Sequence, residues 1–179
     1  MAEVFVKLLG TPQITVNGQP AYFHYRKAEG LFYYICVKKM ISREEAVSIL
    51  WASVEDKTAK KNLRNALYHI RSLLGNDVLE ISNKATIRLN EALVQTDLDQ
   101  VGTDNIRINY NGDFLSYFFI KGCLEFEQWV DEVRTNYKNM YLRSLQATLG
   151  EFSVQTGKDS LQEYSTLLLE NDLYNEESY

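Results

Sequence analysis

The segment Thr58-Ala-Lys-Lys-Asn-Leu-Arg-Asn-Ala-Leu-Tyr-His-Ile-Arg-Ser-Leu-Leu74 decides how this chain of 179 residues is expected to fold. Its apolar residues recur with the 3.6-residue period of an amphipathic α-helix. Thr58 is a typical N-cap residue, and Gly75 is typical of the position after a helix ends. The apolar stripe contains Leu63, Ala66, Leu67, Ile70 and Leu74. We therefore expect a helix with one face in the core and the opposite face available for binding.

The polar face of this predicted helix carries side chains that proteins use to bind DNA. It presents Lys61, Arg64, Asn65 and Tyr68, flanked by His69, Arg71 and Ser72. Lys and Arg neutralise phosphates, whereas Arg and Asn can form paired hydrogen bonds with guanine and adenine. A charged stripe can also serve only to solvate an exposed helix. Residues 57–71 contain no Asp or Glu, so we expect no i, i+4 ion pairs on this face, and DNA binding is favoured.

The residues before this segment predict a small antiparallel sheet and a first helix. Residues 3–18 are rich in branched and aromatic side chains around Asn17-Gly18, which is a strong hairpin signal. A third short strand is expected at residues 21–24. The helical period then covers residues 27–38, and Met40-Ile41 is expected to be a connection.

A capped helix precedes the basic helix, and a hairpin follows it. Ser42 and Glu45 predict a capping box at the start of a helix over residues 43–51. Residues 78–82 and 86–89 alternate around a polar tip, which is the pattern of a β-hairpin. The order of strands, three helices and hairpin predicts a winged helix-turn-helix, in which the basic helix would enter the major groove.

Five more basic residues are candidate DNA contacts, and each has a second interpretation. Lys84 at the hairpin tip and Arg88 on its strand can reach a minor groove or phosphates, but such residues also solubilise hairpins. Arg43 can hold a phosphate at the start of the second helix or pair with a neighbouring Glu. Arg26 and Lys27 open the first helix, where amide donors favour an anion, but a role without phosphate contact is the more common one for such residues.

Charge is distributed unevenly along the chain. The formal net charge of −5 by itself argues against a nucleic-acid partner. Residues 1–98 carry a net charge of +3, however, and residues 99–179 carry −8. The acidic part should repel DNA and so help to orient the basic part toward it.

The pattern beyond the hairpin predicts a second, helical domain. Polar residues and glycines over residues 99–111 indicate a joint between a domain of residues 1–98 and a domain of residues 112–179. A helix of about thirty residues is expected to end near Gly157, and another covers residues 160–170. The apolar face of the long helix contains Phe126, Trp129, Val130, Val133, Tyr137, Met140 and Tyr141.

The residues give little support for catalysis, metal binding or membrane insertion. His24 and His69 lack the Cys, His or Asp spacing of a zinc site, and no phosphate loop or nucleophile elbow is visible. We therefore expect no enzyme activity, cofactor or metal. The apolar run of residues 31–37 is too short to span a membrane, and Cys36 and Cys123 fit a reducing compartment, so a cytoplasmic protein is expected.

Several segments, taken in order, resemble a known family. They are Leu9-Gly10, Arg26-Lys27-Ala28, Ser42-Arg43-Glu44-Glu45, Leu50-Trp51, Asn62-Leu63-Arg64-Asn65-Ala66-Leu67-Tyr68, Ile70-Arg71 and Leu74-Gly75. These segments resemble the N-terminal domain of SARP-type bacterial transcriptional activators, which has an OmpR-like winged-helix fold. The resemblance implies that the third helix is the recognition helix, with Lys60, Lys61, Arg64, Asn65 and Tyr68 on it, and that residues 82–88 form the wing.

The second half is similar to the bacterial transcriptional activation domain of the same family. The similar residues are Gly112-Asp113-Phe114-Leu115, Glu127-Gln128-Trp129-Val130, Arg134 and Tyr137. The resemblance implies an α+β chain: a winged helix with a small antiparallel sheet, three helices and a C-terminal wing hairpin, then an all-α TPR-like domain. That domain normally has several more helices, so we expect the chain to be truncated at Tyr179.

Two functions of different classes follow from this reading. The resemblance implies an activator that binds double-stranded promoter DNA, usually at direct repeats through paired protomers, and recruits RNA polymerase; a homodimer is one possible assembly. The alternative is a TPR-like protein-interaction module whose winged helix contacts protein in place of DNA.

Overall fold

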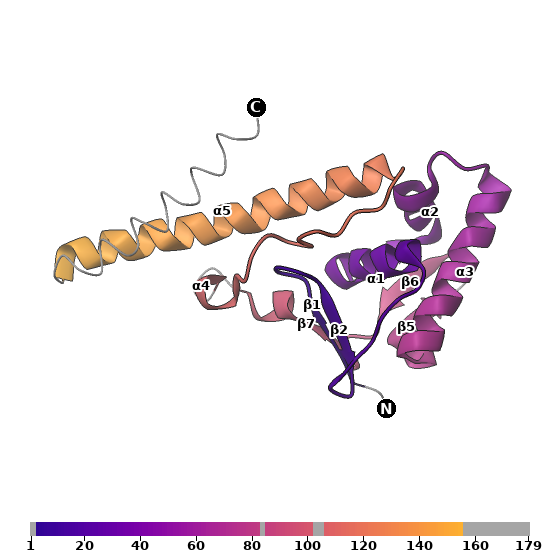
Figure 1. Cartoon of the computed structure of the whole chain (residues 1–179), viewed down its shortest axis with the longest axis horizontal. Helices are drawn as coiled ribbons and strands as arrows, with labels where there is room; N and C mark the ends of the chain where they lie inside the picture. Colours follow the sequence, from indigo (N-terminus) through magenta and orange to yellow (C-terminus); the bar gives the residue numbers. More distant parts are fainter. Residues whose placement is uncertain (1–2, 83–84, 102–105, 156–179) are drawn as a thin grey trace.

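The computed structural model describes residues 3–82, 85–101 and 106–155, and its first sheet combines segments from both ends of the N-terminal region (Figure 1). β1 (Val4–Lys7) pairs antiparallel with β2 (Gln13–Val16), which pairs with β3 (Gln19–Pro20). β7 (Val94–Thr96) adds to the other edge of β1 in parallel. The predicted third strand at residues 21–24 is wrong: the strand lies at Gln19–Pro20 instead, and after it the Ala21 amide donates to the Ile14 carbonyl oxygen at 2.9 Å.

Three helices follow, close to their predicted positions. They are α1 (Arg26–Lys38), α2 (Arg43–Trp51) and α3 (Asp56–Leu74). α3 begins two residues before its predicted start, with Glu55 at the N-cap. The acidic side chain in its first turn is stabilised by the positive end of the helix dipole, so Thr58 is not needed as a cap.

Only the serine half of the predicted capping box is present among the described hydrogen bonds. The Ser42 hydroxyl oxygen accepts from the Glu45 amide at 2.9 Å. The Glu45 carboxylate instead accepts a 2.8 Å hydrogen bond from the Tyr34 hydroxyl. Burial and the neighbouring carboxylate raise the pKa of Tyr34, so its hydroxyl stays protonated as a donor. Glu45 therefore ties α1 to α2.

The predicted hairpin forms part of a second, three-stranded antiparallel sheet. After a 3-10 turn, η1 (Asn76–Val78), β5 (Leu79–Ser82) pairs with β6 (Thr86–Leu89). β4 (Met40–Ser42) pairs with the other side of β6, so the expected connection at Met40-Ile41 is wrong. Ile41 is buried opposite Ile87, and this burial stabilises a strand too short to be recognised from its own sequence.

The chain then leaves the sheets and ends in one long helix. η2 (Asp97–Gln100) and α4 (Ile106–Asn109) fall in the predicted joint. α5 (Leu124–Gln155) contains 32 residues, starts beside α2 and extends away from it (Figure 1). The expected helix end near Gly157 and the helix at residues 160–170 lie outside the described residues. A TPR-like array of helices stays a prediction.

One hydrophobic core connects the regions on either side of the predicted joint. The Tyr34 and Trp129 rings pack edge to face with their centroids 4.6 Å apart. The Cys123 thiol donates to the Leu50 carbonyl oxygen at 3.3 Å. A Cβ on Gly30 would lie 2.3 Å from Ile120 Cδ1, so the missing side chain leaves room for this packing. The division into two domains stays a prediction.

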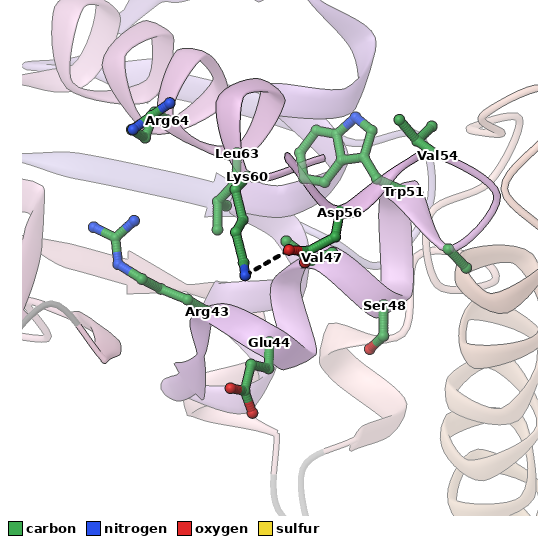
Figure 2. A pocket seen from close by; sticks show the side chains of 11 residues that line it. Arg43, Glu44, Val47, Ser48, Trp51, Val54, Asp56, Lys60, Leu63 and Arg64 are labelled. Atoms are coloured by element: carbon green, nitrogen blue, oxygen red, sulfur yellow. Dashed lines mark hydrogen bonds and ion pairs between the residues drawn. The ribbon is translucent and has the colours of Figure 1, made fainter. Parts of the chain in front are cut away.

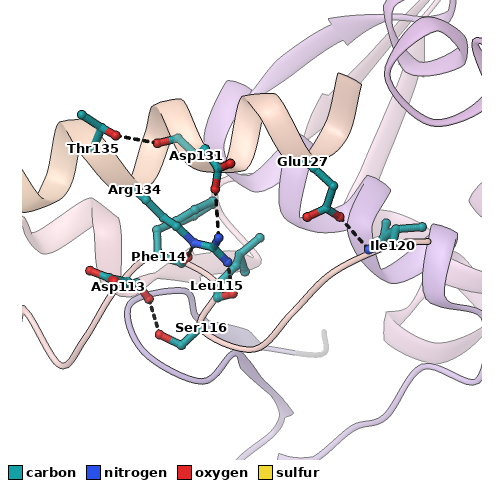
Figure 3. A network of polar contacts seen from close by, with 9 residues as sticks. All are labelled: Asp113, Phe114, Leu115, Ser116, Ile120, Glu127, Asp131, Arg134 and Thr135. Atoms are coloured by element: carbon teal, nitrogen blue, oxygen red, sulfur yellow. Dashed lines mark hydrogen bonds and ion pairs between the residues drawn. The ribbon is translucent and has the colours of Figure 1, made fainter. Parts of the chain in front are cut away.

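The loop before α5 is held in place by side chains of that helix (Figure 3). Arg134 donates from Nε to the Phe114 carbonyl oxygen at 2.8 Å and from Nη2 to the Leu115 carbonyl oxygen at 2.9 Å. Glu127 accepts a 2.7 Å hydrogen bond from the Ile120 amide. These contacts hold Leu115 at a φ of 49°, which non-glycine residues rarely adopt.

Within the described ranges, no helix combines the length and apolar character needed to cross a membrane.

Candidate nucleic-acid interface

α3 separates an apolar face from a polar one, as its sequence predicts. The buried side chains are Ala59, Leu63, Ala66, Leu67, Ile70 and Leu74. Lys61, Arg64 and Asn65 are exposed, and their side chains make no hydrogen bond or ion pair with the described residues. Tyr68 on the same face is 69% exposed. Four adjacent side chains that can bind phosphates and base edges are therefore open to an external partner.

A concavity of about 820 Å³ lies between α2 and α3 (Figure 2). Arg43, Lys60 and Arg64 contribute its basic side chains, and Val47 and Trp51 contribute apolar ones. Helical periodicity alone places Val47 on the buried side of α2, but the side chain is only half-buried. This apolar wall was not predicted, because it depends on the angle between two helices rather than on either sequence segment.

Lys60 has an ion-pair partner that the sequence reading missed. Its Nζ lies 2.7 Å from the Asp56 carboxylate, as the dashed line in Figure 2 shows. The expectation that this face has no i, i+4 ion pair is therefore wrong, because α3 begins at Asp56 and brings that carboxylate onto the same face. Both side chains are exposed, so the pair contributes only about 0.3–0.5 kcal/mol and leaves Lys60 free to exchange partners.

A second concavity, of about 700 Å³, lies between α3 and the wing strand β5. Arg43, Arg64, Tyr68 and Arg71 line it together. Arg71 also donates from Nη2 to the Leu79 carbonyl oxygen at 2.8 Å, which joins the end of α3 to β5. The two concavities share Arg43 and Arg64, so we describe them as one surface, the α3 surface, which four basic residues line together with Glu44 and Asp56.

The structure describes only one of the two basic residues predicted for the wing. Lys84 lies outside the described residues. Arg88 is exposed on β6, where its guanidinium lies 3.4 Å from the Met40 sulfur. Ile81 lines the second concavity, whereas Arg88 is paired with Glu80, the residue before Ile81. Because successive strand residues point to opposite faces, Arg88 lies on the face of the wing sheet away from the α3 surface.

Arg26 and Lys27 have partners within the chain. The Arg26 guanidinium carbon lies 3.9 Å from the centre of the Phe118 ring, and the side chain pairs with Glu29 at 3.2 Å. Lys27 donates from Nζ to the Leu50 carbonyl oxygen at 2.7 Å. Neither residue lines the two concavities of the α3 surface. Both side chains therefore join α1 to neighbouring segments, Arg26 to the loop before α5 and Lys27 to α2, and a phosphate contact for either one stays a prediction.

His69 supports the aromatic end of the α3 surface. Its ring packs edge to face against Tyr25 and Tyr68, with centroids 5.5 and 5.9 Å away. His69 thereby links the start of α1 to the exposed Tyr68. Among the residues that the structure describes, no group of three or more His, Cys, Asp or Glu side chains could hold a metal ion.

The chain was compared with known families and structures. It matches no protein-family model and no curated protein. Its structure is similar to that of Mycobacterium tuberculosis EmbR, solved in complex with a low-affinity phosphopeptide, with a TM-score of 0.57, 13% sequence identity and 86% of this chain covered. The similar region spans 50% of the EmbR chain. The chain therefore shares the fold of this part of EmbR, with mixed α and β structure and a winged-helix-like N-terminal part.

Proposed function

We propose that this chain is a sequence-specific DNA-binding transcriptional regulator whose α3 enters the major groove. The observation that carries the proposal is the set of exposed side chains on α3 without internal partners, above all Arg64 and Asn65. Both residue types can distinguish bases by paired hydrogen bonds.

The proposal assigns different roles along the α3 surface. Arg64 and Asn65 would read base edges, and Tyr68 would pack against the sugar or a thymine methyl group. Lys61 and Lys60 would neutralise phosphates, Lys60 by exchanging its contact with Asp56. The Arg71–Leu79 hydrogen bond supports this arrangement, because it keeps the wing beside the helix that would enter the groove.

We further infer that the regulator is an activator that binds promoter DNA as paired protomers and recruits RNA polymerase. This part rests on the resemblance to SARP-type activators, whereas the similarity to EmbR concerns the fold alone. The chain spans half of the EmbR chain.

A salt titration of DNA binding tests the proposal. The chain is mixed with fragments of its source genome at low salt, bound fragments are recovered, and the affinity of one of them is measured as salt increases. We expect log K to fall linearly with log salt concentration, with a slope of about −0.9 per neutralised phosphate and several units in total. Arg143→Ala on α5 is the matched control, and it should keep the wild-type slope. Absence of binding to any fragment at low salt would refute DNA binding.

A second candidate is a protein-interaction module, which one feature of the loop before α5 favours. Tyr117, Phe119 and Leu124 are 90%, 64% and 66% exposed. Exposed apolar side chains so close together are typical of protein contacts. Two results together would support the protein-interaction function. The chain would bind no DNA, and its association with a protein partner would be lost in Phe119→Ser and kept in Arg64→Ala.

A further inference from the structure

The second concavity of the α3 surface has the composition of an anion site. Three arginines, Arg43, Arg64 and Arg71, line it together with Tyr68, Ser72 and Asn76, and no Asp or Glu does. Arg43 is the first residue of the nine-residue α2, whose positive dipole end therefore lies at the edge of the concavity. Three guanidinium groups with no carboxylate among them repel one another and favour a bound anion.

Two of these arginines have unused donors. The Nε atoms of Arg43 and Arg71 are buried and have no hydrogen-bond partner among the described residues. Arg71 uses only Nη2, for the Leu79 carbonyl oxygen, and the Arg43 guanidinium makes no hydrogen bond or ion pair with the described residues. A buried charged donor without an acceptor is costly, and native proteins rarely keep one without a functional reason.

We propose that Arg43 and Arg71 together bind one phosphate group, which in the DNA complex is a single phosphodiester of the backbone. This inference rests on the proposed DNA binding and deepens it by naming what these two side chains hold. Guanidinium groups suit the task, because their planar fork matches two oxygens of one phosphate. After small rotations of both side chains toward the concavity, the phosphate oxygens would accept hydrogen bonds from the two Nε–H groups.

A shared phosphate would fix how α3 sits in the groove. Arg43 belongs to α2, whose first amide donates to the Ala85 carbonyl oxygen at 2.9 Å, and Arg71 is joined to β5 through Leu79. The phosphate would therefore be held from α2, α3 and the wing at once. Arg64, which lies about two helical turns before Arg71 on α3, would remain available for a base edge.

The salt dependence of DNA binding distinguishes one shared phosphate from two separate ones. We expect Arg43→Ala and Arg71→Ala each to weaken binding about tenfold while leaving the salt slope close to that of the wild type, because the remaining arginine still neutralises the shared phosphate. The double variant should reduce the magnitude of the slope by about 0.9, because only then does the phosphate lose both partners. Single variants that each reduce the slope by about 0.9, with about twice that reduction in the double variant, would overturn the proposal. Arg143→Ala should change neither quantity.

Replacement of single phosphates by neutral methylphosphonates gives an independent test. One position should weaken binding by the wild-type chain, have a smaller effect on Arg43→Ala and on Arg71→Ala, and have no effect on the double variant. If the two variants lose sensitivity at different positions, the shared site is refuted. Because Arg71→Ala also removes the hydrogen bond to Leu79, Arg71→Lys serves as a second variant: it keeps the charge, and we expect it to bind more weakly than the wild type while melting at the same temperature.

Inorganic phosphate separates failure of this inference from failure of the proposed function. If the wild-type chain binds no DNA at low salt, DNA binding itself is refuted. The NMR signals of the Arg43 and Arg71 Nε–H groups are then followed on addition of inorganic phosphate. Shifts of both signals that are absent in the double variant would support a shared phosphate site for a small phosphorylated ligand. Unchanged signals would overturn the site altogether.

Discussion

Arg71 donates from Nη2 to the carbonyl oxygen of Leu79 at 2.8 Å, so a side chain near the end of α3 holds the first residue of the wing strand. This contact turns a helix and a hairpin that are adjacent in the chain into one surface. Arg43 and Tyr68 lie in the same concavity. The orientation of the wing relative to α3 is therefore set before any partner binds.

Arg64 and Lys61 should differ in their effect on DNA recognition. Arg64→Ala is expected to cost about 1–3 kcal/mol of binding free energy on the preferred sequence and to relax discrimination at one base pair. Lys61→Ala is expected to weaken binding equally on all sequences and to reduce the salt slope by about one unit. Competition binding with single-base-pair variants of the site measures both. Equal losses on every sequence for Arg64→Ala would show that Arg64 does not read a base.

Lys27 should affect stability rather than DNA binding. Its ammonium group donates to the Leu50 carbonyl oxygen at 2.7 Å and lies 5.6 Å from the Trp51 ring. Lys27→Met keeps the apolar stem and removes this charged hydrogen bond, so we expect a loss of about 1–2 kcal/mol in the free energy of unfolding. Urea denaturation measures that loss, and the salt slope of DNA binding should stay at the wild-type value. A lower slope with unchanged stability would instead assign Lys27 to a phosphate.

Gly10 should tolerate no side chain, for two separate reasons. Its φ is +86°, and a Cβ would lie 2.6 Å from the Asn111 carbonyl oxygen. We expect Gly10→Ala to lower the free energy of unfolding by at least about 2 kcal/mol, because backbone strain and a backbone clash add. Gly18→Ala is the matched control, since Gly18 has a φ of +78° with nothing within 4 Å of the added Cβ. Equal losses for the two variants would mean that contact with Asn111 contributes nothing.

The pair of Lys39 and Asp99 should make stability depend on pH in the acid range. Burial by itself raises the pKa of Asp99, but hydrogen bonds from Lys39 and Thr96 outweigh it and hold the pKa below its usual value. A lowered folded-state pKa stabilises the protein above the unfolded-state pKa of about 3.9, and this stabilisation is lost as the pH falls through the lowered pKa. Asp99→Asn should therefore be less stable than the wild type at neutral pH.

The difference between the two chains should shrink as the pH falls below about 4. Urea denaturation at a series of pH values measures it, with Asp131→Asn on the exposed side of α5 as a control. A difference that stays constant down to the lowest pH would show that the charge of Asp99 does not contribute.

The helices could be predicted because the signals that define them are local. The bounds of α1 and α2 follow from apolar spacing and from the Ser42 cap, all within a few residues. β4 and β7 were missed, because a three-residue strand has no pattern of its own and forms only by pairing with a strand that lies far along the chain.

The candidate site likewise combines features that local sequence predicts with features that depend on packing between distant segments. The exposed face of α3 was predicted, whereas its proximity to Arg43 was not, because it depends on how α2 packs against α3. The Asp56–Lys60 pair could have been found by starting the helix two residues earlier. The contacts of Arg26 with Phe118 and of Lys27 with Leu50 could not, because these partners are brought together only when the helices and the loop before α5 pack.

The sequence by itself determined which face of α3 is basic, because the direction of a helical side chain depends only on its spacing along the helix. It also determined the order of helices and hairpin around that face. Only the tertiary structure decided which basic residues share a surface: it placed Arg43, Arg64 and Arg71 around one concavity and turned Arg26, Lys27 and Arg88 elsewhere. The neighbours of a side chain depend on how distant segments pack, and no local spacing encodes that packing.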